Sequence, residues 1–381
     1  MKRRILDFIV CPDCGKHLRL EPLEHKRREN EIELSPVPRC STYCALKGAE
    51  IAASSPTGDF DCCACYRDEI ITGLLSCGCG ALFPIVRGVP RVFHNALRYF
   101  SSDLESWRDQ VKIRLPASGN GSPFSRFDKE VEQVRKRFEF QWQKWGRGER
   151  IFGRTEEEML AQLTGKGTGS PLKASFYAGK LVLDAGCGHG RYVECFHKLG
   201  AEVVGMDLGE GIDIAYELYG HLPHAHFIQA NILKAPLAAG MFDFVFSYGV
   251  LHHTPDTRAA FNKLAPLVAQ NGWMEIWVYP REGLLWEVSQ KVIRSITTRL
   301  PPAFLYLLCF IPVPLLKFKT YSGTNLSTSS WKECAQVIWD WYSPRYQWHH
   351  TRDEVRGWFE AAGFEDLKFF PPDVGAIGRK K

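Results

Sequence analysis

Three alternating glycines, placed between a predicted strand and a predicted helix, carry the clearest chemistry in the sequence. The apolar run at 181–183 predicts a buried parallel strand, and the pattern YVECFHKLG predicts a helix that ends at Gly200. Between them lie Asp184, Gly186, Gly188 and Gly190. A strand, a turn of bare backbone and a helix N-terminus predict a nucleotide-binding βα unit. The G-x-G-x-G spacing differs from the dinucleotide fingerprint and from the P-loop, so we expect another cofactor.

The next predicted strand ends in a carboxylate. Residues 201–207 read AEVVGMD, and Asp207 closes this run. The carboxyl ends of neighbouring parallel strands lie at the same edge of a sheet, so Asp207 is expected beside the glycine turn. A carboxylate at that place can accept hydrogen bonds from two ribose hydroxyls, and its charge disfavours a phosphorylated ribose.

Cysteine is concentrated near the beginning of the chain. Nine of the thirteen cysteines fall within the first 79 residues: Cys11, Cys14, Cys40, Cys44, Cys62, Cys63, Cys65, Cys77 and Cys79. Asp7 and the Cys11-Pro12 pair interrupt the early apolar stretch, which is too short for a secretory signal. Close cysteine pairs without an export signal are typical of metal thiolates rather than disulfides. We therefore expect a metal-binding protein of the reducing cytoplasm.

Four of these cysteines predict a zinc site. The Cys11-x-x-Cys14 spacing lets two sulfurs reach one tetrahedral ion. The second pair, Cys77 and Cys79, has one intervening residue instead of two, and the flanking glycines relax the backbone there. We expect these four thiolates to hold zinc; the alternative is a remnant that keeps only the shape of a metal-binding module.

The remaining cysteines allow a second four-thiolate site. Its candidate ligands are Cys40, Cys44, Cys62 and Cys65, with Cys63 as a replacement for Cys62. An iron–sulfur cluster and a loop with reactive thiols are the alternatives, and spacing alone does not decide among the three.

The glycine turn and its surroundings resemble the class I S-adenosylmethionine-dependent methyltransferases. Four motifs occur in that family's order: LVLDAGCGHGRY, FDFVFSYGVLHHTPD, GWMEIWVY, and VRGWFEAAGFEDLKFF followed by VGAIGRK. The resemblance covers residues 176–381 and implies an α/β fold with a doubly wound, seven-stranded Rossmann-like sheet. An insertion of about 281–345 interrupts it and is expected to form a cap.

The resemblance implies a set of cofactor contacts. Asp184 would orient the methionyl amine, the glycines would pass the methionine part, Asp207 would hold the ribose, and Leu208 would line the adenine. Asn231 stands where the family usually has Asp, although an amide oxygen can still accept the hydrogen bond of the adenine amino group. The full expected set is Asp184, Gly186, Gly188, Gly190, Asp207, Leu208, Asn231, Ile232 and Ser247.

The motif FDFVFSYGVLHHTPD narrows the chemical class of the methyl acceptor. The sequence from Ser247 to Val250 lacks the Asn/Asp-Pro-Pro-aromatic signature of enzymes that methylate planar amino groups, and it looks like the small-molecule and quinone-biosynthesis branch. His252 and His253 follow at the expected pocket mouth. Either is a candidate general base, because imidazole titrates near neutrality, and the alternative is a role in shaping the pocket.

The rest of the chain divides into two further parts. Residues 1–95 resemble a zinc ribbon of the short proteins that activate tRNA and translation-factor methyltransferases, with a cysteine-rich insertion. Residues 96–175 are predicted to be a helical linker or cap, including an aromatic, basic helix at 131–146. The segment 339–351, dense in aromatic residues, is expected either to cover the substrate pocket or to pack in the core.

Together these features predict a methyltransferase that uses S-adenosylmethionine and zinc and acts at O, N or C of a small or lipid-linked metabolite. An RNA methyltransferase is the first alternative, although a net charge of +5 is low for an RNA-binding protein. A non-catalytic cofactor-binding scaffold is the second. The oligomeric state stays open.

An uncharged run at 301–316 contains four prolines and is too short and too broken to span a bilayer. Basic residues bracket it: Arg294, Arg299, Lys317 and Lys319. Three burial partners are open: the protein's own core or substrate pocket, another subunit, or an anionic lipid surface that would make the protein a peripheral membrane protein.

Overall fold

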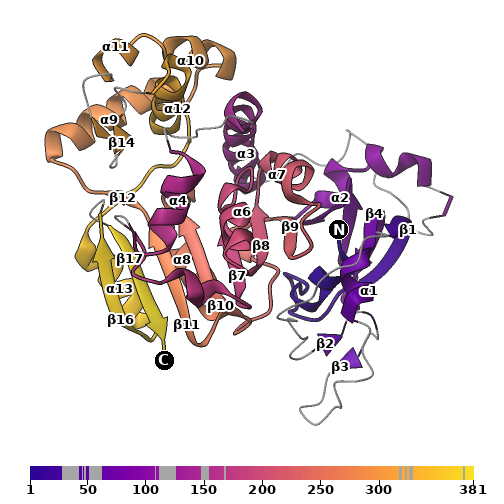
Figure 1. Cartoon of the computed structure of the whole chain (residues 1–381). Helices are drawn as coiled ribbons and strands as arrows, with labels where there is room; N and C mark the ends of the chain where they lie inside the picture. Colours follow the sequence, from indigo (N-terminus) through magenta and orange to yellow (C-terminus); the bar gives the residue numbers. More distant parts are fainter. Residues whose placement is uncertain are drawn as a thin grey trace.

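The fold is known from a computed structural model, which describes residues 1–27, 43–44, 46, 49–50, 62–107, 109–110, 126–146, 154–166, 169–316, 320–321, 324–325, 329–371 and 374–381. Figure 1 shows a long central sheet with helices on its two faces and a separate helical group at one end.

Seven strands of the sheet follow the order β9-β8-β7-β10-β11-β17-β16. The first five are parallel, and β17 is antiparallel to both of its neighbours. Their bounds are β7 Leu181–Ala185, β8 Glu202–Asp207, β9 Ala225–Ala230, β10 Phe242–Tyr248, β11 Val268–Trp277, β16 Phe364–Phe370 and β17 Gly375–Lys380. The predicted seven-stranded α/β sheet is confirmed.

Helices cover both faces of this sheet, as a doubly wound fold requires. One face carries α4 (Glu156–Leu163), α5 (Ala174–Tyr177), α6 (Arg191–Lys198) and α7 (Gly211–Tyr219), and the other α8 (Thr257–Leu264) and α13 (Arg352–Ala361). The sequence sets the first residues of α4 and α13 through capping boxes, in which Thr155 and Thr351 accept from backbone N–H groups that would otherwise lack partners.

The cysteine-rich module extends the same sheet instead of standing apart from it. Its strands β1 (Arg19–Arg27), β4 (Asp68–Ser76), β5 (Leu82–Val86) and β6 (Val89–Val92) bring the sheet to eleven strands, because β6 pairs in parallel with β9. The fully buried Arg91 of β6 fixes this junction with ion pairs and hydrogen bonds to Asp213 of α7 and Gln229 of β9. The ribbon therefore covers a strand edge that would otherwise be open.

Short elements complete the N-terminal part. They are η1 (Arg3–Asp7), β2 (Tyr43–Cys44), β3 (Ala49–Glu50), α1 (Cys62–Arg67), α2 (Ala96–Tyr99) and η3 (Ser102–Trp107). A longer helix, α3 (Arg126–Trp145), occupies the region where the sequence predicts an aromatic, basic helix. It packs against α7 and α12, so that it lies at the carboxyl edge of the central strands (Figure 1).

The insertion after β11 forms a helical group of its own. It contains β12 (Tyr279–Pro280), α9 (Leu284–Thr297), α10 (Pro302–Leu308), α11 (Val313–Leu316), β13 (Thr320–Tyr321), β14 (Thr324–Asn325), α12 (Trp331–Tyr342) and β15 (His349–His350). A parallel pair between β12 and β15 closes the insertion at its base. Among the described residues, no helix is long and apolar enough to cross a membrane.

Candidate functional site

A cavity of about 210 Å³ opens at the carboxyl edge of β7, β8 and β10. Helix α3 forms one wall through Phe138 and Trp142, and α12 contributes Asp340. Of the predicted cofactor residues, five line it: Gly186, Asp207, Leu208, Asn231 and Ile232. The structure thus gathers at one cavity residues that are up to 46 positions apart in the sequence.

The turn after β7 has a backbone that only glycine adopts without strain. Gly186, Gly188 and Gly190 have φ values of +90°, +55° and +87°. A Cβ on Gly186 would lie 2.4 Å from the Val250 side chain, and one on Gly188 would lie 2.7 Å from the Trp142 ring. The turn is therefore held between a loop of the sheet and the helix above it.

Asp207 is oriented by the same turn. Its Oδ2 accepts a hydrogen bond of 2.9 Å from the backbone N–H of Gly188, and its Oδ1 accepts one of 2.7 Å from that of Gly209. Burial raises the pKa of this carboxyl, while the backbone N–H groups act in the opposite direction. Each oxygen has a second lone pair, so the carboxylate can still accept two hydrogen bonds at the cavity.

Asp184 lies behind the turn and does not line the cavity. Its side chain is buried, and its Oδ2 accepts no hydrogen bond from any residue that the structure describes. Burial, with the nearby charge of Asp207, raises its pKa well above the ordinary value. A buried carboxyl oxygen without a donor indicates a missing donor, which a bound ligand or a water can supply.

The side-chain oxygen of Asn231 already accepts one hydrogen bond from the backbone. Its Oδ1 accepts from the N–H of Leu233, 2.9 Å away, and so begins the short helix η4 (Ile232–Lys234). Ser247 is fully buried and donates its Oγ hydrogen to the carbonyl of Ala185 at 2.8 Å, which ties β10 to β7 behind the cavity wall. Ser247 is therefore placed to support the strand that leads into the glycine turn, without lining the cavity.

The two histidines of η5 (Leu251–His253) differ in position. His253 lines the cavity, whereas His252 is stacked on Tyr279 with ring centroids 3.9 Å apart. The Nδ1 of His253 lies 2.9 Å from the carbonyl oxygen of Tyr346, which only accepts, so Nδ1 carries the proton. The Nε2 atoms of the two rings are 3.1 Å apart.

His253 also faces a carboxylate. Its Nε2 is 4.0 Å from the Oδ2 of Asp340, which accepts a 2.6 Å hydrogen bond from the Tyr279 hydroxyl. Burial lowers the pKa of His253, and the charge of Asp340 opposes that shift. The ring is therefore neutral at neutral pH and has a carboxylate beside it that would stabilise its protonated form.

Several cavity residues were not identified from the sequence. Arg154 donates to Gln162 at 2.6 Å and reaches the Tyr248 hydroxyl at 3.5 Å. Arg191 begins α6, and burial lowers its pKa to about 10, so it stays charged at neutral pH. His189 packs against Trp142 with the two rings tilted by 36°, and neither of its ring nitrogens has a hydrogen-bond partner among the described residues. His189 stands inside the glycine motif, and this position is the signal that could have identified it.

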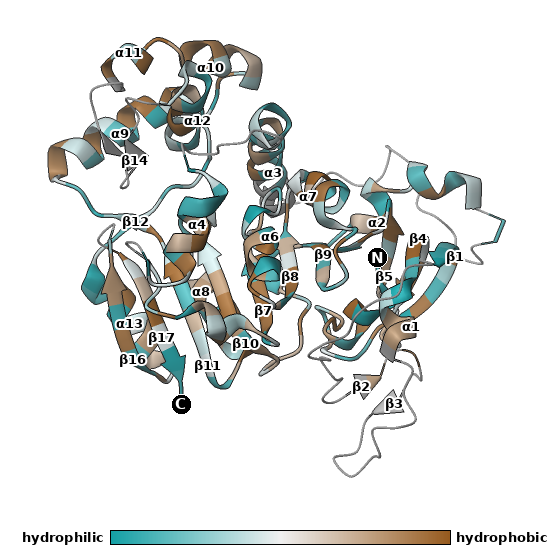
Figure 2. Cartoon of the chain, viewed as in Figure 1, coloured by the Kyte–Doolittle hydropathy of each residue, from teal (hydrophilic) through white to brown (hydrophobic). Residues whose placement is uncertain are grey.

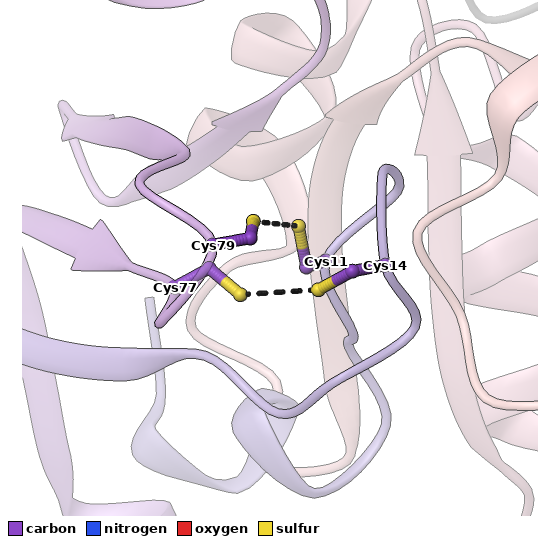
Figure 3. Close-up of side chains that lie close together, drawn as sticks. All are labelled: Cys11, Cys14, Cys77 and Cys79. Atoms are coloured by element: carbon purple, nitrogen blue, oxygen red, sulfur yellow. Dashed lines mark hydrogen bonds between the residues drawn. The ribbon is translucent and has the colours of Figure 1, made fainter.

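The first four predicted metal ligands lie together at the tips of two ribbon loops (Figure 3). The sulfur atoms of Cys11 and Cys79 are 3.7 Å apart, those of Cys14 and Cys77 are 3.3 Å apart, and all four lie within 4.8 Å of one another. A tetrahedral zinc with bonds of about 2.3 Å sets its sulfurs about 3.8 Å apart. The donor set and its spacing therefore fit zinc.

The second cysteine cluster is not settled by the structure. Cys44 and Cys65 are buried, but Cys40 and the side chain of Cys62 lie outside the described residues. The second metal site stays a prediction.

Comparison with known proteins agrees with this geometry. Residues 183–276 match the family described as "Methyltransferase domain", which confirms the predicted resemblance for this region. Ubiquinone biosynthesis O-methyltransferase of Albidiferax ferrireducens is 33% identical over 101 residues, which cover 26% of this chain and 40% of that protein. The enzyme of the same name from Escherichia coli O157:H7 is 31% identical over 128 residues, covering 31% of this chain and 53% of that protein. The chain thus spans about half, or less, of the length of these relatives.

Two solved structures are also similar. Magnesium protoporphyrin IX methyltransferase of Synechocystis PCC 6803 with bound SAM has a TM-score of 0.39 at 15% identity, covering 69% of this chain and all of that one. The 1,6-didemethyltoxoflavin-N1-methyltransferase of Burkholderia thailandensis has a TM-score of 0.39 at 17% identity, covering 71% of this chain and 98% of that one.

Proposed function

We propose that this chain, which carries a methyltransferase domain at residues 183–276, transfers a methyl group from S-adenosylmethionine to a small or lipid-linked metabolite. The observation that carries the proposal is the glycine turn with Asp207 oriented beside it at a cavity. The ubiquinone biosynthesis enzymes among the relatives support a metabolite rather than a nucleic acid as acceptor.

The cavity suits this cofactor in shape and in charge. Asp207 would accept from the ribose hydroxyls, and Leu208 and Ile232 would contact the adenine. The orphaned oxygen of Asp184 would take the methionyl ammonium through a bridging water, since Asp184 does not line the cavity. Arg191 supplies a positive charge for the methionyl carboxylate.

The cofactor supplies an activated methyl group on its sulfonium, and the chain supplies position and a dry environment. Phe138, Trp142, Tyr248 and Trp277 line the cavity, and with the cofactor and acceptor bound they would exclude water from the reacting atoms. Because only one of the two histidines lines the cavity, His253 is the one placed to meet an acceptor. To take the acceptor's proton at Nε2, the ring would first release the hydrogen bond that this atom accepts from Nε2 of His252, 3.1 Å away; Asp340 would then stabilise the resulting cation.

The thiolate cluster would hold one structural zinc ion. Four cysteine ligands leave no open position on a tetrahedral ion, so the metal would stabilise the ribbon and take no part in catalysis. Through β6 and β9 the ribbon in turn supports the sheet edge next to the cofactor strand β8.

The test is methyl transfer from S-adenosylmethionine carrying a radiolabelled methyl group. The purified protein is incubated with a lipid extract, a water-soluble metabolite extract and total RNA, and label is counted in each fraction. The proposal expects label in one of the first two fractions. Label in RNA alone would establish the alternative acceptor, and the absence of cofactor binding by calorimetry would reject the function altogether.

A further inference from the structure

Large apolar side chains are exposed almost exclusively on the helical insertion. Of fourteen exposed large hydrophobic residues among those described, eleven lie between positions 284 and 315, on α9, α10 and α11 or just after them. Leu285 is 88% exposed, and Ile311 and Leu315 are each 72% exposed. In Figure 2, hydrophobic residues, coloured brown, are frequent along α10, α11 and parts of α9, at the end of the molecule away from the ribbon. We call the exposed apolar side chains of residues 284–315 the apolar face.

Helix α9 is amphipathic, but its apolar side chains face solvent instead of the core. Two of its polar side chains point inward: Gln290 donates to the Tyr342 hydroxyl at 3.0 Å, and Arg294 donates to the carbonyls of Trp341 and Pro344. Its apolar positions Leu284, Val288, Val292 and Ile296 recur every four residues and are all exposed. A surface helix of a globular protein normally places its apolar stripe toward the core. The stripe on α9 is therefore turned away from the core and toward solvent.

The proline-rich run that follows has two faces. Leu305, Cys309 and Val313 are buried in a small core with Val337 and Trp339 of α12, so this half of the run caps the insertion itself. Phe304, Leu307, Ile311 and Leu315 point away from that core and are exposed. The inward half explains how the run folds, and the outward half continues the apolar face of α9.

Between residues 288 and 332 the charge has one sign, and Glu287, just before this stretch on α9, lies 2.7 Å from Nδ1 of His349. Residues 288–332 contain no Asp or Glu, although the whole chain has 43 acidic residues. The same stretch contains six basic residues: Lys291, Arg294, Arg299, Lys317, Lys319 and Lys332. Lys291 and Arg299 are exposed beside the apolar side chains of α9; Lys317 and Lys319 lie outside the described residues. A surface that is both apolar and basic is complementary to an anionic lipid bilayer.

We infer that the apolar face docks the protein on the surface of an anionic lipid bilayer. Since no described helix is long and apolar enough to cross a membrane, the helices lie in the interface. Trp286 of α9 and Trp331, the first residue of α12, are both exposed, and indole rings favour the headgroup region of a bilayer. The basic residues then meet the lipid phosphates.

A second copy of the chain fits the face less well. A twofold contact places the same patch on both subunits, so the basic residues of one copy would face those of the other. The patch has no acidic side chain between 288 and 332 to pair with them. The inference goes beyond the proposed function and stands on separate observations, because no residue of the apolar face lines the cofactor cavity.

The test measures binding to vesicles by flotation. Wild-type protein is mixed with vesicles of phosphatidylcholine alone, or with phosphatidylcholine containing about one third phosphatidylglycerol. The variant combines Val288→Glu and Val292→Glu, at positions that are 50% and 59% exposed, so the fold should tolerate both. The matched control is Lys263→Glu, which changes the net charge by the same two units at an exposed position of α8.

We expect wild type and Lys263→Glu to bind the anionic vesicles at least tenfold more tightly than the neutral ones, and added salt to weaken that binding. The double variant should lose at least tenfold, with an unchanged thermal unfolding midpoint. Equal binding by the variant and the control would overturn the inference. So would a concentration-dependent dimer in sedimentation without lipid that the double variant abolishes.

Calorimetry with S-adenosylmethionine on the same samples keeps the two proposals apart. Intact cofactor binding without vesicle binding rejects the lipid surface only. Vesicle binding without cofactor binding rejects the methyltransferase function only.

Discussion

Removal of the Asp207 carboxylate tests the cofactor assignment most directly. The two variants of choice are Asp207→Ala, which deletes both acceptor oxygens, and Asp207→Asn, which keeps the shape and removes the charge. In the Asn variant the amide group must face a backbone N–H of Gly188 or Gly209, donor against donor. The Ala variant therefore loses both ribose contacts, the Asn variant keeps a single uncharged acceptor oxygen, and both disturb the glycine turn.

The expected loss follows from the energy of a hydrogen bond to a charged group. Such a bond contributes about 1.5–3 kcal/mol, which corresponds to a roughly 10- to 150-fold weaker dissociation constant. Glu360→Ala, which removes a carboxylate from the exposed face of α13, serves as the control and should change the affinity less than about twofold.

A larger dissociation constant alone would not show whether the variant has lost the ribose contact or has a damaged glycine turn. Calorimetry is therefore run with S-adenosylhomocysteine and with its 2′-deoxy analogue, on wild type and on Asp207→Ala, as a double-mutant cycle. In wild type, deleting the hydroxyl should cost affinity. In the variant it should cost little, because the partner is gone. If the two losses simply add, Asp207 does not contact the ribose and the assignment is wrong.

Three further outcomes are expected. Replacing Cys11 and Cys14 together by Ser should remove one equivalent of zinc in elemental analysis and lower the thermal midpoint, whereas bound iron would contradict the site as we assign it. Burial lowers the pKa of His226 to about 4, so this histidine binds its proton at higher pH in the unfolded chain than in the folded one. The free energy of unfolding, measured by urea titration, should therefore decrease as the pH falls from 7 to 4. The decrease should be less steep in His226→Gln. Filter binding to RNA should be weak, with a shallow dependence on salt; a steep negative slope would favour the RNA alternative.

The sequence located the parts of the fold that depend on local pattern. The runs ending in Asp184 and Asp207 became β7 and β8, and the last predicted helix and hairpin became α13, β16 and β17. These elements are recognisable because a buried parallel strand is a continuous apolar run and a terminal helix has caps. The glycine turn was predictable for the same reason, since only glycine accepts its backbone angles.

Features that depend on distant contacts were not predictable. Nothing local to residues 89–92 indicates that they pair with β9, because an edge strand looks the same whether it is covered or not. Arg154 reaches the cavity from a segment whose placement is set by tertiary packing. The segment 339–351, expected either to cover the pocket or to pack in the core, does both, because Asp340 lines the cavity and Trp339 is fully buried. The uncharged run at 301–316 left its burial partner open, and the inverted orientation of α9 was visible only once its polar side chains were seen to bond inward.

The insertion and the helix over the cofactor site form one packed unit. Phe140 of α3 stacks on Trp339 of α12 with ring centroids 4.7 Å apart, and the Trp145 indole donates to the carbonyl of Lys332 at 2.9 Å. On its other side α3 holds the glycine turn through Trp142. Helix α12 also carries Asp340 into the cavity, and its Tyr342 accepts a hydrogen bond from Gln290 of α9. Helices α3 and α12 together therefore connect the glycine turn and the cavity wall near His253 to the apolar face. A bilayer that holds α9 in place would therefore also fix the side of the cavity at which a lipid-linked acceptor arrives.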